Sequence, residues 1–193
     1  MGLIEERIKE SISTKEAVLQ SSELLKLVGS AANEICSCLK NGGKVLLCGN
    51  GGSSSDASHI AGELVGRFQR ERKAMPAIAL NGDIATMTAV ANDYGYEKVF
   101  ERGVEGLMTK QDVLIGISTS GNSENVYLAV MKAKEIGGKT IALLGKDGGK
   151  IKDEADIPII VPSDCTARIQ ESHIMIGHIL CELAEDAYAN GWE

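Results

Sequence analysis

Apolar residues recur at helical spacing over the first forty positions of the chain. Residues 3–39 read as two helices, and Ser21 and Ser22 mark the start of the second one, because a serine oxygen can accept hydrogen bonds from the unpaired N–H groups of a first helical turn. The sequence Asn-Gly-Gly at 41–43 is typical of a helix end. We therefore predict that two helices precede the first strand.

Five short apolar runs follow, and most of them are bounded by Gly, Ser, Asn or Asp. They cover residues 44–48, 77–80, 113–117, 140–144 and 157–161. Most of the runs lead into a helical pattern such as 124–136, and a final long helix is expected over 167–188. Continuous apolar strands that alternate with helices are typical of a parallel sheet buried on both faces by its crossover helices. The pattern therefore predicts an α/β fold.

Length and composition favour one globular domain that needs no disulfides. The 193 residues are 44% hydrophobic and 24% charged, which is enough apolar material for a sizeable core. The net charge of -7 and the isoelectric point near 5.1 argue against general nucleic-acid binding, because proteins hold phosphate backbones with clusters of Lys and Arg. An anionic ligand must therefore be bound by local donors.

The cysteines and the first residues of the chain indicate a cytoplasmic protein. The five cysteines are odd in number and show no CxxC spacing, which favours reduced thiols. The N-terminal segment is acidic and amphipathic, so it does not resemble an export signal. No stretch approaches the roughly 18 uninterrupted apolar residues of a membrane span, so no membrane partner is expected.

Two loops rich in glycine and hydroxyl groups follow predicted strands. The first loop is 50–55 (NGGSSS), and the second loop is 118–123 (STSGNS). Ligands of open parallel sheets bind at the carboxyl ends of strands, and helix N-termini favour anions. Either loop alone could be an N-capped turn, but the two together indicate a phosphate site. Neither fits the Walker or the GxGxxG motif, which favours the phosphate of a small substrate over ATP or NAD.

His59 and Glu63 lie four residues apart on the helix predicted after the first loop. This spacing places an imidazole and a carboxylate on one helix face, and zinc accepts both as ligands. On an ordinary surface helix such a pair is usually a solvated polar face. Its position directly after a phosphate-type loop instead indicates an acid–base pair or a metal site. The basic residues that follow are interpreted as a solvated helix end: Arg67, Arg70, Arg72 and Lys73.

Four segments of the chain resemble the sugar isomerase (SIS) domain family and, within it, the phosphoheptose isomerases. They are CGNGGSSSDASHIAGEL (48–64), AVANDYG (89–95), GISTSGNSENV (116–126) and ARIQESHIMIGHILCEL (167–183). The similarity covers nearly the whole chain. It implies a three-layer αβα sandwich on a five-stranded parallel, flavodoxin-like sheet, with two additional N-terminal helices.

The resemblance also implies an organisation and an activity. It implies a single SIS domain over 1–193, with helices over 1–41 at an oligomer interface and an αβα core over 44–190. The implied assembly is a homotetramer with active sites between subunits. The implied reaction is the aldose–ketose isomerisation of sedoheptulose 7-phosphate to D-glycero-D-manno-heptose 7-phosphate through a metal-assisted enediol. This is the first step of heptose precursor synthesis for surface glycans, as in lipopolysaccharide biosynthesis.

Matching the family motifs to this sequence implies a set of site residues. Those implied to bind the sugar phosphate are Asn50, Gly51, Gly52, Ser53, Glu63, Asn92, Asp93, Ser118, Thr119, Ser120, Ser123 and Gln170. Those implied to hold one Zn2+ per subunit are His59, Glu63, Gln170 and His178. Glu63 and His178 are the implied proton-transferring pair, whereas His173 is interpreted as structural or surface.

Two features of the implied site leave alternatives open. Gln170 and His178 lie eight residues apart, which is about 12 Å along a straight helix. They reach one ion only if their side chains converge, if the helix breaks near Gly177, or if neighbouring chains supply them; a site shared between subunits fits the family. Glu63 is implied as both ligand and base, so it must bind the metal weakly or release it during the reaction.

Two other functions are considered. Some proteins of this fold have no catalytic activity and bind the bacterial replication initiator as tetramers, but those relatives lack the His–Glu pair and the late histidine present here. An isomerase for a pentose or hexose phosphate would share the same phosphate loop. Because the shape of the pocket selects the chain length of the sugar, the sequence leaves this alternative open.

Overall fold

The computed structural model describes residues 2–192, and its first two elements are the predicted helices α1 (Gly2–Gln20) and α2 (Ser22–Lys40). The Ser21 side chain accepts a hydrogen bond from the N–H of Leu24 at 3.2 Å and so caps α2 as predicted. The helix ends at Lys40, Asn41 is its C-cap residue, and Gly42 follows with a φ of +79°.

Five parallel strands form one sheet in the order β2-β1-β3-β4-β5, which confirms the flavodoxin-like arrangement. The strands are β1 (Val45–Gly49), β2 (Ala77–Ala79), β3 (Val113–Ser118), β4 (Lys139–Gly145) and β5 (Ile157–Val161). Each strand boundary lies within one residue of its prediction. β1 and β3 are buried along their whole length, as a central parallel strand covered on both faces must be.

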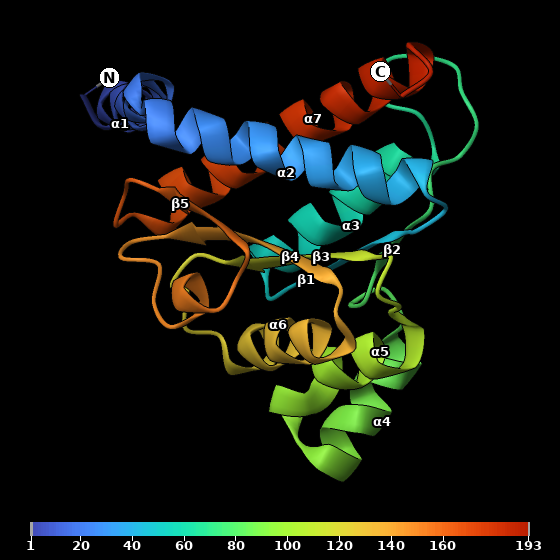
Figure 1. Cartoon of the computed structure of the whole chain (residues 1–193). Coiled ribbons are helices and arrows are strands. Elements are labelled where there is room, and N and C mark those ends of the chain that lie inside the picture. Colours follow the sequence, from blue (N-terminus) through green and yellow to red (C-terminus); the bar gives the residue numbers. More distant parts are fainter. Residues whose placement is uncertain (1, 193) are drawn as a thin grey trace.

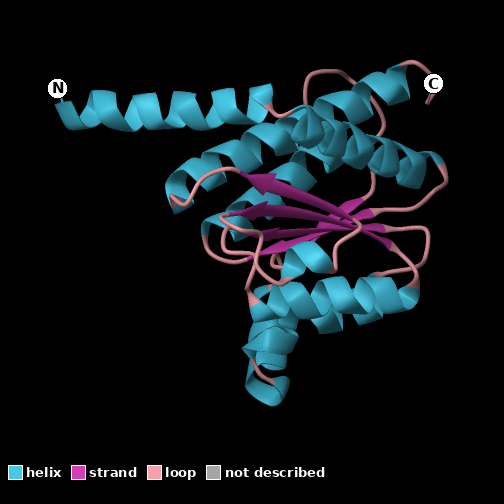
Figure 2. Ribbon diagram, turned by 60° about the vertical axis from the view of Figure 1, so that its left-hand side comes forward, coloured by secondary structure: helices cyan, strands magenta, loops and turns pink. Residues whose placement is uncertain are grey.

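The remaining helices complete the three layers seen in Figures 1 and 2. They are α3 (Gly52–Val65), α4 (Ile84–Tyr94), η1 (Tyr96–Lys98), α5 (Val99–Leu107), α6 (Glu124–Ile136), η2 (Ile151–Asp153) and α7 (Thr166–Ala189). α2, α3 and α7 cover one face of the sheet, where Leu47 and Ile115 point. α5 and α6 cover the other face, where Leu46 and Leu114 point, because successive strand residues face opposite sides. The predicted αβα sandwich is confirmed.

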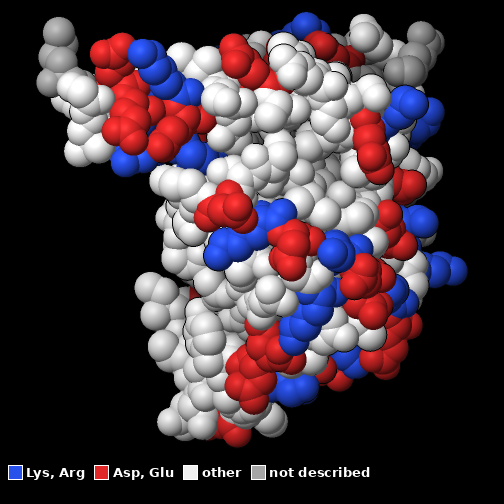
Figure 3. All heavy atoms as spheres, turned by 90° about the vertical axis from the view of Figure 1, so that its left-hand side faces the viewer, with Lys and Arg blue, Asp and Glu red and all other residues white. Residues whose placement is uncertain are grey.

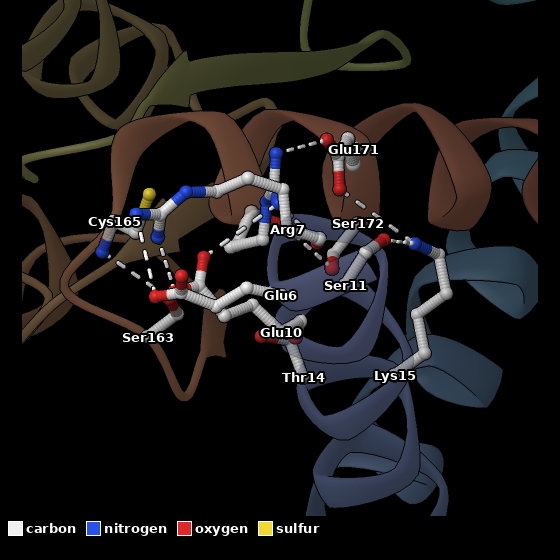
Figure 4. Close-up of polar contacts among 11 residues, drawn as sticks. Glu6, Arg7, Glu10, Ser11, Thr14, Lys15, Ser163, Cys165, Glu171 and Ser172 are labelled. Atoms are coloured by element: carbon white, nitrogen blue, oxygen red, sulfur yellow. Dashed lines mark hydrogen bonds and ion pairs between the residues drawn. The ribbon is translucent and has the colours of Figure 1, made fainter. Parts of the chain in front are cut away.

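A polar cluster attaches α1 to the first turns of α7 (Figure 4). Arg168 donates to the carbonyl of Arg7 at 2.6 Å and to Oε1 of Glu171 at 2.7 Å, and Lys15 lies 3.9 Å from the other oxygen of Glu171. Only Thr14 and Val18 of α1 are buried, and the helix extends away from the body of the protein (Figure 2). Its exposed apolar residues are Leu3, Ile4, Ile8, Ile12 and Leu19.

Acidic and basic side chains alternate over the surface shown in Figure 3, and no continuous basic area forms on that face. This mixture is consistent with the net charge of -7. Within residues 2–192, no helix combines the length and the apolar character needed to cross a bilayer.

Candidate active site

The two hydroxyl-rich loops meet at the carboxyl ends of β1 and β3, which are neighbouring parallel strands. Gly49 at the end of β1 pairs with Ile117 at the end of β3, so the first loop (50–55) and the second loop (118–123) leave the sheet side by side. The chain continues from β1 to β2 on one side and returns to β3 on the other. This is the topological switch point where open α/β sheets bind ligands. The predicted placement of the two loops is confirmed.

The first loop turns directly into α3. Gly51 has a φ of +56°, and the backbone N–H groups of Ser53 and Ser54 donate to the carbonyls of Asn50 and Gly51, both at 3.0 Å. A Cβ atom on Gly52 would lie 2.6 Å from Nε2 of Gln170, so the start of α3 and the side chain of Gln170 fit only because this residue is glycine.

The second loop is held closed by its own hydroxyls and by the loop after β4. The hydroxyls of Ser118 and Ser123 lie 3.0 Å apart at the start of α6. Gly121 has a φ of +67°, and a Cβ atom there would lie 1.9 Å from the carbonyl oxygen of Gly148. The N–H of Ile151 donates to the carbonyl of Gly121 at 3.1 Å. Two backbone segments therefore pack against each other to shape this loop.

His59, Glu63 and His178, the His–Glu–His group, come together between α3 and α7. Nε2 of His59 lies 3.0 Å from Oε1 of Glu63 and 3.4 Å from Nε2 of His178. The three ligand atoms all lie within 4.8 Å of one another. Two ligands at about 2.1 Å from one zinc ion and at a tetrahedral angle are separated by roughly 3.4 Å, so the donor types and spacings fit a zinc site.

A close approach of the two helices creates this group. A Cβ atom on Gly177 would lie 2.5 Å from Cδ1 of Ile60, so glycine at this position allows α7 to pack directly on α3. The side chains of His59 and His178 stand beside this contact. α7 runs unbroken from Thr166 to Ala189, which excludes the suggested helix break near Gly177.

Gln170 does not lie with the His–Glu–His group in this chain. Its side chain packs on Gly52 at the start of α3, and His178 lies about 12 Å further along the unbroken α7. Gln170 therefore faces the first loop.

Asn92 and Asp93 lie on α4, in the layer on the opposite side of the sheet from α3 (Figure 1). Both are exposed, and the Asn92 amide donates to the carboxylate of Asp93 at 2.8 Å. Every residue of α4 keeps some exposure, including Ile84 and Tyr94. The structure therefore does not bring these two residues to the His–Glu–His group of the same chain.

The prediction that Arg72 belongs to a solvated helix end is wrong. The side chain of Arg72 is 2% exposed and lies 3.0 Å from the carboxylate of Glu185, and it donates to the carbonyls of Leu64 and Glu63 at 2.8 and 2.7 Å. It thus closes the carboxyl end of the helix that carries His59 and Glu63.

Sequence reasoning also missed Phe68 and Asp56. The ring of Phe68 stacks on His178, with centroids 5.4 Å apart and planes at 25°. Burial raises the pKa of Asp56, and the nearby His59 and His178 oppose that rise. Asp56 precedes His59 by three residues on α3, so a search for polar residues at helical spacing could have found it. No local pattern marks Phe68.

His173 is a core residue. It is fully buried, and its Nε2 lies 2.8 Å from the carbonyl oxygen of Leu144, to which it donates. Burial lowers its pKa to about 4, against the smaller opposing effect of this hydrogen bond. The neutral ring is therefore structural, which is one of the two roles expected from the sequence.

Comparison with known proteins identifies the family. A family model described as SIS domain matches residues 10–145. The chain is 57% identical to the phosphoheptose isomerase of Nitratiruptor sp. over 96% of this chain and 98% of that protein. It is 53% identical to the phosphoheptose isomerase of Clostridium acetobutylicum over 95% of this chain and 94% of that protein.

A solved structure gives the same result. The phosphoheptose isomerase of Francisella tularensis superposes with a TM-score of 0.92 at 41% identity, over 96% of this chain and 97% of the other. The chain therefore belongs to the SIS domain family. Within that family it falls among the phosphoheptose isomerases and is an aldose–ketose isomerase.

Proposed function

We propose that this protein converts sedoheptulose 7-phosphate to D-glycero-D-manno-heptose 7-phosphate with the help of a bound zinc ion. The observation that carries the proposal is the His–Glu–His group, of which His59 and Glu63 stand on the helix that begins at the first loop and His178 stands on α7. A phosphate held at the loops places the other end of a sugar within reach of imidazole and carboxylate groups. The named relatives, which are phosphoheptose isomerases, support this choice of sugar.

The loops would bind the substrate through backbone and hydroxyl donors. The second loop would hold the phosphate with Ser118, Thr119, Ser120 and Ser123 at the N-terminus of α6, where free N–H groups and the helix dipole favour an anion. The first loop would contact the sugar through Asn50, Gly51, Gly52 and Ser53, and Gln170 lies against this loop.

Glu63 and His178 would move the protons. Isomerisation removes a proton from the carbon beside the carbonyl and returns it to the neighbouring carbon, while the two oxygens exchange carbonyl and hydroxyl character. Oε1 of Glu63 faces His59, and the second carboxylate oxygen of Glu63 makes no hydrogen bond to residues 2–192. We propose that one carboxylate oxygen stays with the metal ligands while the other acts as the base, which would make the two implied roles compatible.

His59, Glu63 and His178 would hold the zinc ion. When bound, the ion supplies positive charge that stabilises an enediolate. Because Gln170 lies at the first loop of its own chain, we propose that a neighbouring subunit supplies it as a further ligand. Asn92 and Asp93 on α4 would likewise reach the site of another subunit.

These shared residues require an oligomer, and we propose a homotetramer of single-domain chains. The exposed apolar residues of α1 favour a role for the N-terminal helices in its interface. A monomeric variant is expected to lose bound metal and activity together. A fully active monomer would refute the shared site.

We further propose that the protein works in the cytoplasm, on the precursor of a heptose-containing surface glycan. All five cysteines are free thiols, which supports a reducing compartment. The non-catalytic alternative, binding to a replication initiator, is not favoured, because the His–Glu–His group is complete in one chain.

The test is to incubate the purified protein with sedoheptulose 7-phosphate and to follow the anomeric proton of the aldose by NMR. Conversion should stop after treatment with a chelator and return when Zn2+ is added. Ribulose 5-phosphate and fructose 6-phosphate serve as controls for the length of the sugar. An absence of conversion by the zinc-loaded protein, or equal rates with all three sugars, would refute the proposal.

A further inference from the structure

A hydrogen-bonded trio of side chains joins the two loops. The amides of Asn50 and Asn125 bind each other twice, with Nδ2 of Asn50 donating to Oδ1 of Asn125 at 2.8 Å and Nδ2 of Asn125 donating to Oδ1 of Asn50 at 2.9 Å. The hydroxyl of Tyr96 donates to Oδ1 of Asn50 at 2.8 Å. Asn125 is 3% exposed, so its pairing matters to the fold as well as to the site.

A backbone group fixes the direction of all these bonds. The N–H of Val126 lies 3.0 Å from the side chain of Asn125, and a backbone N–H can only donate. The atom that it meets must therefore be the oxygen of Asn125. That oxygen in turn requires a donor from Asn50, which places Nδ2 of Asn50 against Asn125 and leaves Oδ1 of Asn50 as the acceptor.

This direction determines what Asn50 can offer to a ligand. Its oxygen accepts from Asn125 and from Tyr96, so both acceptor positions are used. Its nitrogen donates one hydrogen to Asn125, and the second N–H is not used within this trio. Asn50 can therefore donate one N–H bond to a ligand and has no acceptor left for a ligand hydroxyl.

We propose that Asn125 and Tyr96 are positioning residues that lock the Asn50 amide so that it donates to an oxygen of the sugar. Asn125 lies two residues after Ser123 in the first turn of α6, while Asn50 directly follows β1. The amide pair therefore sets the spacing between the loop that would hold the phosphate and the loop that would contact the sugar. This inference rests on the proposed substrate.

The test is a double-mutant cycle on the zinc-loaded protein. Binding of sedoheptulose 7-phosphate and of inorganic phosphate is measured by calorimetry for the wild type, Asn50→Ala, Asn125→Leu and the double variant. Each single variant should bind the sugar phosphate about tenfold more weakly, the loss of one neutral hydrogen bond, while phosphate affinity changes by less than about threefold. The double variant should bind the sugar phosphate at most about threefold more weakly than Asn50→Ala does.

A second pair of variants avoids any disturbance of the core. Tyr96 is 55% exposed, so Tyr96→Phe removes its hydroxyl without touching buried packing. We expect it to raise KM about three- to tenfold. Tyr94→Phe changes a neighbouring tyrosine that is 56% exposed, and it should leave KM within about twofold of the wild type.

Two results would overturn the inference. One is an additive double-mutant cycle in which phosphate affinity falls together with sugar affinity, because that would make Asn125 a support for α6 alone. The other is a KM for Tyr96→Phe equal to that of Tyr94→Phe. A wild-type protein that binds the sugar phosphate without isomerising it would instead refute the proposed reaction, and the binding cycle would still decide the role of Asn125.

Discussion

Replacing Glu185 with glutamine removes one partner of a buried ion pair behind the active site. The carboxylate is 3% exposed, accepts the backbone N–H groups of Phe68, Gln69 and Arg70 at 2.8, 2.8 and 3.2 Å, and lies 3.0 Å from Nε of Arg72. Glutamine would bring an NH2 group to one of these donors and leave Arg72 without its counterion. Breaking a buried pair on one side costs about 3–5 kcal/mol.

This cost is large beside the total free energy of unfolding, which for a single domain is about 5–15 kcal/mol. For a chain of this size it corresponds to a fall in melting temperature of roughly 6–20 °C. The assay is thermal unfolding followed by circular dichroism. Glu182→Gln is the matched control, because Glu182 is exposed on the same helix, and it should stay within about 0.5 kcal/mol of the wild type. Equal melting temperatures for the two variants would refute the reasoning.

The pH dependence gives a second check on Glu185. Burial alone would raise the pKa of its carboxyl group, but the backbone N–H donors and Arg72 outweigh burial and lower that pKa. The stabilisation is therefore present above about pH 4.3, the unfolded pKa, and is lost as the pH falls through the lower folded pKa. Glu185→Gln should flatten this acid limb of the stability curve.

Three further predictions concern the site itself. Glu63→Gln should reduce turnover at least about 10²-fold while phosphate still binds, and near-normal turnover would remove Glu63 from the mechanism. Gly121→Ala should weaken inorganic phosphate binding at least about tenfold, because its Cβ would meet the carbonyl of Gly148. Gly42→Ala is the control for backbone strain, because Gly42 has a similar positive φ but open space around it, and this variant should leave phosphate binding unchanged. Phe68→Leu should weaken zinc binding about two- to tenfold in competition with a chelator, through loss of the stacked ring.

Local patterns predicted the elements of this fold well. The helix over 124–136 and the strand over 157–161 were predicted to the residue, because apolar runs and the Gly, Ser and Asn positions that bound them act within a few residues. The same local reasoning placed both loops at one edge of the sheet. His59 and Glu63 were found because helix period alone puts them on one face.

Partners that lie far apart in the sequence could not be predicted in this way. Arg72 appeared solvated because the residue that buries it, Glu185, comes more than a hundred positions later. No local pattern marks Asn125, because its pairing with Asn50 depends on the adjacency of β1 and β3. A helical or strand pattern specifies which face a side chain occupies, whereas tertiary packing specifies what it meets there.

The register between α3 and α7 explains why one chain cannot complete the implied metal set. Gln170 packs on Gly52, Gly177 on Ile60, and Glu185 on the loop that begins after α3, so the two helices run in the same direction with a nearly constant offset. His178 therefore meets the middle of α3, where His59 stands, and Gln170 meets its start. A slide of α7 by about two turns could bring Gln170 to His59, but it would carry His178 away by the same distance, and the contact of Gly177 with Ile60 prevents such a slide. A Gln170 ligand for the ion beside His178 would therefore have to come from a second copy of the chain.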